Sequence, residues 1–99
     1  MDTEQIIQTL KKEKPTLRER FQIIKIALFG SVASGNATED SDIDILFELK
    51  GDTRLGFRES FELEHFFQEL FKPRRVDLVN QRFINPIIEE DIKGKLRYV

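Results

Sequence analysis

Residues 29–49 read FGSVASGNATEDSDIDILFEL, and they place a Gly-Ser turn between two segments with the composition of strands. The segment before the turn, residues 21–29, is short and rich in β-branched and aromatic side chains, which predicts a buried strand. Residues 31–34 leave room for only a short helix, and Gly35 is suited to its C-terminal cap. The polar residues 36–41 then form a loop, so this stretch predicts strand, short helix, loop and strand in that order.

The second of these strands begins at Asp42 and has two chemically different faces. Asp42 and Asp44 point to one side, and Ile43 and Ile45 point to the other. Side chains at i and i+2 of a strand have Cα atoms about 7 Å apart, and two carboxylates at that distance repel by about 2 kcal/mol at an effective dielectric constant of about 20. A divalent cation would reverse the sign of this repulsion. Because the ligands are oxygens and the chain has no cysteine, Mg²⁺ or Mn²⁺ is the expected ion.

A phosphate-binding element and a third carboxylate accompany this pair. Gly30 ends the first strand and Ser31 opens the short helix, so backbone N–H groups and a hydroxyl can face an anion there. Asp77 lies inside a third predicted strand, RRVDLVN at residues 74–80, where it can bind the metal and help to deprotonate an acceptor hydroxyl. Phosphoryl and nucleotidyl transfer require such a phosphate cradle beside metal-binding carboxylates.

Helices are predicted before and after these strands. Thr3 can cap the N-terminal helix, which should end before Pro15 because proline disfavours helical geometry in the preceding residue. One more short turn can start at Thr16. Phenylalanine and leucine recur at helical spacing over residues 57–71, and this helix should supply much of the core. A last helix lies within residues 85–94, with asparagine as its cap and proline at its first position, and the tail LRYV adds a short strand.

This alternation of helices and strands predicts one α/β domain over residues 1–99, with a sheet covered by helices. The short connection between the first two strands leaves a mixed sheet as plausible as a parallel one. The formal net charge of −2 argues against a long nucleic-acid partner. No apolar stretch approaches the roughly 20 residues of a membrane span, and the N-terminus lacks the order of a signal peptide, which predicts a cytoplasmic protein without a membrane segment. Nine phenylalanines in so small a domain can leave an apolar patch suited to a partner or a homo-oligomer.

The sequence excludes two other motifs, a P-loop and an EF-hand, because residues that each motif requires at fixed positions are missing. GSVASGNA has the two glycines of a P-loop, but Asn36 and Ala37 stand where lysine and a hydroxyl residue are required. The aspartates before Ile45 resemble the start of an EF-hand, yet Ile45 takes the place of the obligatory glycine and Gly51 that of the bidentate glutamate. The single histidine, His65, lies in the aromatic helix and is interpreted as a helix-surface or partly buried residue without a metal role.

The spacing Gly30-Ser31, ten residues, then Asp42-Ile43-Asp44 resembles the signature of the polymerase-beta-like nucleotidyltransferase superfamily. LFGSVASGNATEDSDIDILFEL looks most like its minimal, single-domain members, the MNT proteins that are encoded beside HEPN-domain partners in prokaryotic toxin–antitoxin pairs. The similarity continues through the aromatic helix, RRVDLV and the closing INPIIEEDIKGKLRYV, and so covers most of the chain. It implies the superfamily fold, a small mixed sheet flanked by helices.

The resemblance also implies the chemistry of the site. Gly30 and Ser31 would hold the phosphates of ATP, and Asp42, Asp44 and Asp77 would be the catalytic carboxylates that bind magnesium, with two ions expected. The implied reaction transfers AMP from ATP to a hydroxyl and releases pyrophosphate. In antitoxins of this type the acceptor is a tyrosine of the partner HEPN toxin, an RNase that AMP addition silences, so the chain is expected to act as an antitoxin.

One position departs from the family pattern. Many relatives carry arginine directly before the position of Gly35, whereas this chain has Ser34. Two other functions therefore stay open: a catalytically weak antitoxin that neutralises its HEPN partner by binding alone, and a transferase that acts on a small molecule. The cations that can replace the missing arginine from elsewhere in the chain are Lys50, Arg54, Arg74 and Arg75.

Overall fold

The computed structural model describes residues 1–99 as one sheet with helices on both of its faces. In chain order the elements are α1 (Thr3–Phe21), β1 (Ile23–Phe29), α2 (Gly30–Ser34), β2 (Ile43–Leu49), α3 (Phe57–Phe71), β3 (Val76–Asn80), the 3₁₀ turn η1 (Gln81–Phe83), α4 (Pro86–Ile92) and β4 (Arg97–Tyr98). The predicted order of helices and strands is confirmed, including the short C-terminal strand, and η1 is the one element that the sequence patterns did not indicate.

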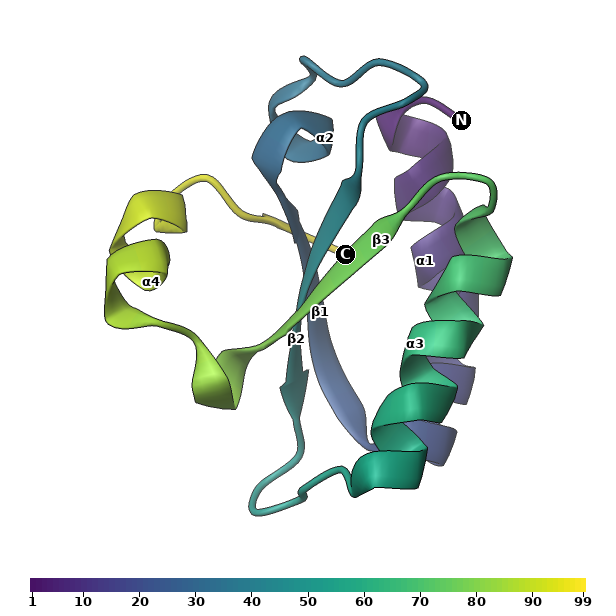
Figure 1. Cartoon of the computed structure of the whole chain (residues 1–99), viewed down its shortest axis with the longest axis vertical. Helices are drawn as coiled ribbons and strands as arrows, with labels where there is room; N and C mark the ends of the chain where they lie inside the picture. Colours follow the sequence, from purple (N-terminus) through teal and green to yellow (C-terminus); the bar gives the residue numbers. More distant parts are fainter.

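The four strands form a mixed sheet in the order β3-β2-β1-β4. β1 runs antiparallel to β2 and to β4, whereas β2 and β3 are parallel. The short α2 connection returns the chain antiparallel, and the longer crossover through α3 allows the parallel pair. Of the two arrangements that the sequence left open, the mixed sheet is the one formed. The end of β1 and the beginnings of β2 and β3 therefore meet at one edge of the sheet (Figure 1).

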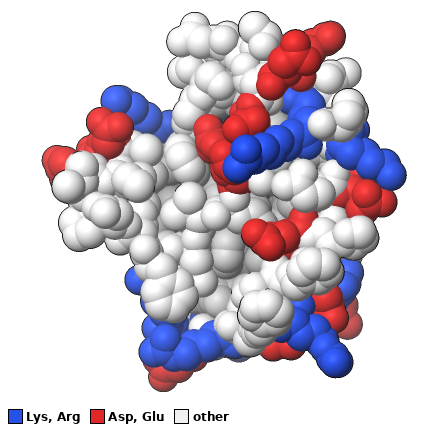
Figure 2. Space-filling model, viewed as in Figure 1, with Lys and Arg blue, Asp and Glu red and all other residues white.

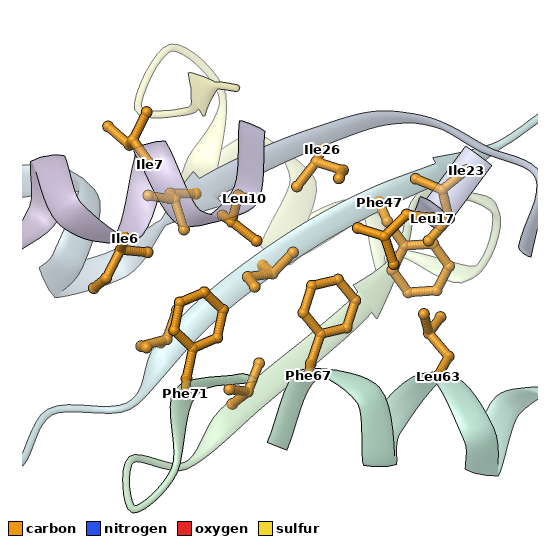
Figure 3. Close-up of a cluster of buried hydrophobic side chains, with 14 of the residues drawn as sticks. Ile6, Ile7, Leu10, Leu17, Ile23, Ile26, Phe47, Leu63, Phe67 and Phe71 are labelled. Atoms are coloured by element: carbon orange, nitrogen blue, oxygen red, sulfur yellow. The ribbon is translucent and has the colours of Figure 1, made fainter. Parts of the chain in front are cut away.

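The hydrophobic core lies between one face of the sheet and the helices α1 and α3 (Figure 1). Figure 3 shows the rings of Phe67 and Phe71 from α3 among isoleucine and leucine side chains of α1 and the strands. The alternation of β2 directs every second residue into this core, namely Ile43, Ile45, Phe47 and Leu49. On the other face, Leu46 is also buried and lines a hollow that α4 and β4 enclose.

Helix α1 does not end before Pro15, and the predicted break with a second short turn is wrong. One continuous helix runs to Phe21, with Pro15 exposed in its interior. Proline removes one intrahelical hydrogen bond and crowds the carbonyl four residues earlier. Leu17 and Phe21 after the proline are buried as completely as the apolar residues before it, so one stripe of side chains packs on the sheet along the whole helix. Burial of this stripe outweighs the local cost of the proline.

The cap of α1 also differs from the prediction, because Asp2 and not Thr3 occupies the N-cap position. The Asp2 carboxylate accepts a hydrogen bond from the Gln5 backbone N–H at 2.8 Å, and the Gln5 side chain accepts one from the Asp2 N–H at 2.8 Å. The Thr3 hydroxyl instead donates to the Val32 carbonyl at 2.8 Å. This contact ties the beginning of α1 to the short helix α2.

Helix α3 supplies part of the core that its aromatic pattern predicted. Leu63, Phe67 and Phe71 are buried, whereas Phe57 and Phe61 are 94% and 67% exposed. The buried residues follow one another at intervals of four, and Phe61 precedes Leu63 by only two residues, which places it on the opposite side of the helix. The predicted exposed aromatic surface is thus present at the beginning of α3. None of the helices has the length and hydropathy that crossing a membrane would take.

Candidate active site

The beginnings of β2 and β3 bring the predicted carboxylates to one edge of the sheet. In the parallel pair of β2 and β3, Asp44 lies directly beside Asp77, and in the antiparallel pair of β1 and β2 it is opposite Phe29. Backbones of neighbouring strands are about 4.8 Å apart, so these partners are close neighbours. Asp42 precedes β2 by one residue, at the i, i+2 spacing that places it on the same side as Asp44. The carboxylates of Asp42, Asp44 and Asp77 are all half-buried there.

The turn after β1 brings the backbone of Gly30 against one of these carboxylates. Gly30 has a φ of +72°, a conformation that residues with a side chain rarely adopt. A Cβ at this position would overlap the carboxylate of Asp44, so only glycine leaves room for that side chain. Ser31 follows in α2, whose N-cap makes no side-chain hydrogen bond to its first N–H groups. Gly30 thus lies against Asp44, and Ser31 is the next residue along the chain.

The proximity of the aspartates changes the acidity of the central one. Burial raises the pKa of the Asp44 carboxyl above its ordinary value, and the negative charges of Asp77 and Asp42 and a side-chain hydrogen bond with Asp77 raise this pKa further. Each of these causes disfavours the charged form of Asp44. A carboxylate cluster under such repulsion is a site where a cation binds favourably.

Arg75 is the nearest cation to this cluster. Its Nη2 lies 3.3 Å from Oδ1 of Asp77, and acidic and basic side chains touch near the beginnings of β2 and β3 in Figure 2. Arg75 and Asp77 are separated by one residue, so the alternation of a strand places them on one side, a signal that the sequence contained. No three carboxylate or imidazole side chains of the chain converge into a ready-made metal site. A metal ion at Asp77 would compete with the Arg75 guanidinium for Oδ1.

The other candidate cations lie outside this cluster. The Arg74 guanidinium donates to backbone carbonyls and not to a carboxylate. Lys50 follows the last residue of β2, about 20 Å along the strand from Asp44 at about 3.3 Å per residue. Arg54 lines a hollow that the end of β2 and the beginning of α3 form. His65 is exposed on α3 beside Glu62, away from the strand ends.

The donor set fits a hard divalent cation. All three side chains are carboxylates, and their mutual repulsion favours a positive charge between them. α2 contributes no basic side chain, in keeping with serine at position 34. The N–H groups at the beginning of α2 follow directly after Gly30, and they can donate hydrogen bonds to the oxygens of an anion. The edge of the sheet can therefore hold a cation and a phosphate group side by side.

Comparison with known proteins agrees with this chemistry. Residues 10–99 match the family model described as the nucleotidyltransferase domain. A protein of Thermococcus cleftensis named protein adenylyltransferase MntA is 36% identical over 96 residues, which span 97% of this chain and 94% of that protein.

Two solved structures have the same fold. One, provisionally assigned as a minimal nucleotidyltransferase, has a TM-score of 0.74 and 28% identity and covers 98% of this chain and 95% of its own. Another contains a tri-AMPylated Shewanella oneidensis HEPN toxin in complex with an MNT antitoxin, with a TM-score of 0.59, 22% identity and coverage of 97% of this chain and 66% of that one. The family match and the relative together show that this chain belongs to the nucleotidyltransferase domain family and is a nucleotidyltransferase.

Proposed function

We propose that this nucleotidyltransferase is a magnesium-dependent protein adenylyltransferase that transfers AMP from ATP to a tyrosine hydroxyl of a HEPN-domain toxin and thereby acts as its antitoxin. The observation that carries the proposal is the strand register that sets Asp44 beside Asp77 and against the Gly30 turn. The same edge offers carboxylates to a metal and backbone N–H groups to a triphosphate. Both are required for nucleotidyl transfer.

Each residue of this edge has a proposed role. Asp42, Asp44 and Asp77 hold magnesium, which when bound neutralises negative charge on the triphosphate. Gly30 and Ser31 hold the phosphates through backbone N–H groups and the serine hydroxyl. Asp77 accepts the proton of the acceptor hydroxyl, whose oxygen forms a bond to the α-phosphorus as the bond to pyrophosphate breaks. Pyrophosphate then leaves, and AMP remains on the acceptor oxygen.

The acceptor is proposed to be a protein for two reasons. The carboxylates lie at an edge of the sheet and are only half-buried, so a segment of another protein can reach them. The Thermococcus relative is named a protein adenylyltransferase, and the Shewanella antitoxin is in complex with a HEPN toxin that carries AMP. By similarity, a HEPN protein encoded nearby is the proposed partner of this chain.

Intact-mass spectrometry tests the proposed reaction. The purified chain, ATP, Mg²⁺ and the HEPN protein encoded beside it should yield partner molecules heavier by one or more AMP groups, and peptide sequencing should place them on tyrosine. Asp42→Asn should abolish the added mass, because a neutral amide is a much weaker magnesium ligand than a carboxylate. Equal masses with and without ATP, or equal labelling by wild type and Asp42→Asn, would refute the enzymatic proposal.

The absence of a basic side chain from α2 supports one alternative, neutralisation by binding alone. Such an antitoxin would form a complex without nucleotide. Its Asp42→Asn and Asp44→Asn variants would still silence the toxin. The proposed enzyme would keep the complex in these variants but lose the silencing. Growth of cells that express the toxin with each variant, together with pull-down of the complex, separates the two functions. Labelling of a panel of small hydroxyl compounds in place of the partner would support the third function, transfer to a small molecule.

A further inference from the structure

In the loop before β2, Ala37 packs against the hydrophobic core, and the polar residues that follow it bond mainly to one another. Its residues 38–41 close on themselves, because the Ser41 N–H donates to the Thr38 carbonyl at 3.1 Å and the Thr38 N–H donates to the Ser41 hydroxyl at 2.9 Å. The Thr38 and Ser41 hydroxyl oxygens are 3.3 Å apart, and the Asp40 N–H donates to the Thr38 hydroxyl at 3.4 Å. These bonds shape the turn but do not attach it to the rest of the protein.

The Arg74 side chain makes that attachment. Its Nε and Nη2 both donate to the Ser41 carbonyl, at 3.1 and 2.9 Å, and Nη2 also donates to the Thr38 carbonyl at 3.3 Å. Its Nη1 donates to the Met1 carbonyl at 3.0 Å, which connects the loop to the residue before the cap of α1. Arg74 thus joins three segments that are distant in the sequence, and each of its partners is a backbone carbonyl.

The backbone around Asp42 is held from both sides by residues 74 and 75. On one side, the Ser41 carbonyl, which belongs to the peptide group that joins Ser41 to Asp42, accepts two hydrogen bonds from the Arg74 side chain. On the other side, the Ile43 N–H donates to the Arg75 carbonyl at 2.9 Å. Because both peptide groups that flank Asp42 are fixed, the direction of its Cα–Cβ bond is fixed as well. The carboxylate of Asp42 has no such restraint of its own.

We propose that Arg74 is a positioning residue for metal binding, whose guanidinium holds the Ser41 and Thr38 carbonyls and thereby aims the Asp42 carboxylate at Asp44 and Asp77. The inference rests on the proposed function, because it assigns the metal to the same aspartates. It differs from a phosphate-binding role for this arginine, because every hydrogen bond of its guanidinium goes to a backbone carbonyl. The planar fork of arginine carries its donors on three separate nitrogen atoms, which here reach three carbonyls, whereas lysine carries all its donors on one nitrogen atom.

Isothermal titration of the metal-free protein with Mn²⁺, without nucleotide, tests the inference independently of catalysis. Residues that orient metal ligands change metal affinity by about 10–100-fold when they are replaced, and we expect Arg74→Gln to raise the Kd by that factor. Arg74→Lys should fall between wild type and Arg74→Gln, because an ammonium group can restore one of the carbonyl contacts. In the transfer reaction, the Mg²⁺ concentration that gives half-maximal rate should rise in Arg74→Gln, and saturating Mg²⁺ should restore most of the rate.

Arg82→Gln is the matched control, because Arg82 donates to the Gly51 carbonyl at 2.8 Å and so joins two segments at the other end of β2. It should bind Mn²⁺ as wild type does, even where both glutamine variants melt at a lower temperature. An unchanged Kd in Arg74→Gln, or equal weakening in Arg82→Gln, would overturn the role of Arg74, as would an Arg74→Lys variant with wild-type affinity. The Asp42→Asn variant tests the metal site separately from the role of Arg74. If this variant binds Mn²⁺ as tightly as wild type, the proposed metal site is wrong, and the positioning role of Arg74 is wrong with it.

Discussion

The charge of the Asp44 carboxylate is needed for the proposed metal binding but lowers the stability of the metal-free protein. Burial, together with the charges of Asp77 and Asp42, raises the pKa of Asp44, so the folded protein binds this proton more tightly than the unfolded chain does. The free energy of unfolding therefore decreases as pH rises from the ordinary carboxyl pKa to the raised one, and it stays lower above that interval. The charge that a metal would bind destabilises the metal-free fold at neutral pH.

Asp44→Asn should accordingly stabilise the metal-free protein while it abolishes transfer. Because Asp44 is only partly buried, solvent screens its repulsion, and we expect a gain of about 0.5–1 kcal/mol. For a domain of this size, that gain raises Tm by roughly 2–8 °C. Thermal melts at pH 7.5 in the presence of EDTA measure it, and the difference from wild type should shrink as pH falls and the wild-type carboxyl becomes protonated. A lower Tm for Asp44→Asn at pH 7.5, or a difference independent of pH, would contradict this electrostatic interpretation.

Gly30 should be the glycine at which an added methyl group costs most activity. Gly30→Ala combines a positive φ with a methyl group that displaces the Asp44 carboxylate, and such a displacement can lower the rate by about 100-fold. Gly51→Ala is the control, because Gly51 also has a positive φ but nothing lies within 4 Å of its added Cβ. Initial rates of AMP transfer and thermal melts should show similar losses of stability but a loss of activity only in Gly30→Ala. Equal activities would show that the contact with Asp44 is unimportant.

Among the secondary structure elements, the sequence predicted the features that depend on neighbouring residues alone. The period-two alternation of β2 set which residues face the core, and asparagine and proline marked the beginning of α4, where the Asn85 side chain accepts a hydrogen bond from the Ile87 N–H at 2.8 Å. The continuation of α1 through Pro15 was not predictable in this way. Burial of Leu17 and Phe21 against the sheet decides it, and this contact exists only in the folded molecule.

Pro15→Ala tests this explanation of α1. Alanine restores the N–H donor in the helix interior and removes the clash with the carbonyl of the preceding turn, and its larger freedom in the unfolded chain offsets part of the gain. We expect a net increase of about 1–2 kcal/mol in the free energy of unfolding, seen in urea titrations with an unchanged m value. Lys12→Ala, an exposed control in the same helix, should change stability by less than about 0.5 kcal/mol. A destabilised Pro15→Ala would mean that the proline contributes to the fold in another way.

The residues of the candidate site were predictable from the sequence, but the strand pairing that brings them together was not. Spacing along one strand identified Asp42 and Asp44, and Asp77 was identified inside another strand, yet the register that makes Asp44 and Asp77 neighbours depends on pairing between distant segments. In the sequence, Arg74 and Arg75 were equivalent candidates to replace the missing arginine. The structure separates them, since Arg74 holds backbone carbonyls while Arg75 pairs with Asp77.

At the scale of the whole molecule, the fold uses its two sheet faces for stability and one sheet edge for chemistry. α1 and α3 bury the core on one face, α4 lies on the other, and the carboxylates remain at the ends of the strands (Figures 1 and 2). Half-buried aspartates at such an edge can bind ions and phosphates and remain open to a hydroxyl from another protein. The proposed transfer reaction therefore depends on whether these three aspartates form a metal site.

Anomalous diffraction from crystals grown with Mn²⁺ and a non-hydrolysable ATP analogue tests that claim most directly. We expect Mn²⁺ peaks bounded by the carboxylates of Asp42, Asp44 and Asp77, with the phosphates of the analogue against Gly30 and Ser31. The Arg75 guanidinium should have left Asp77 in that structure. Data that show the analogue without Mn²⁺ at these aspartates, or Mn²⁺ bound elsewhere on the chain, would contradict the account.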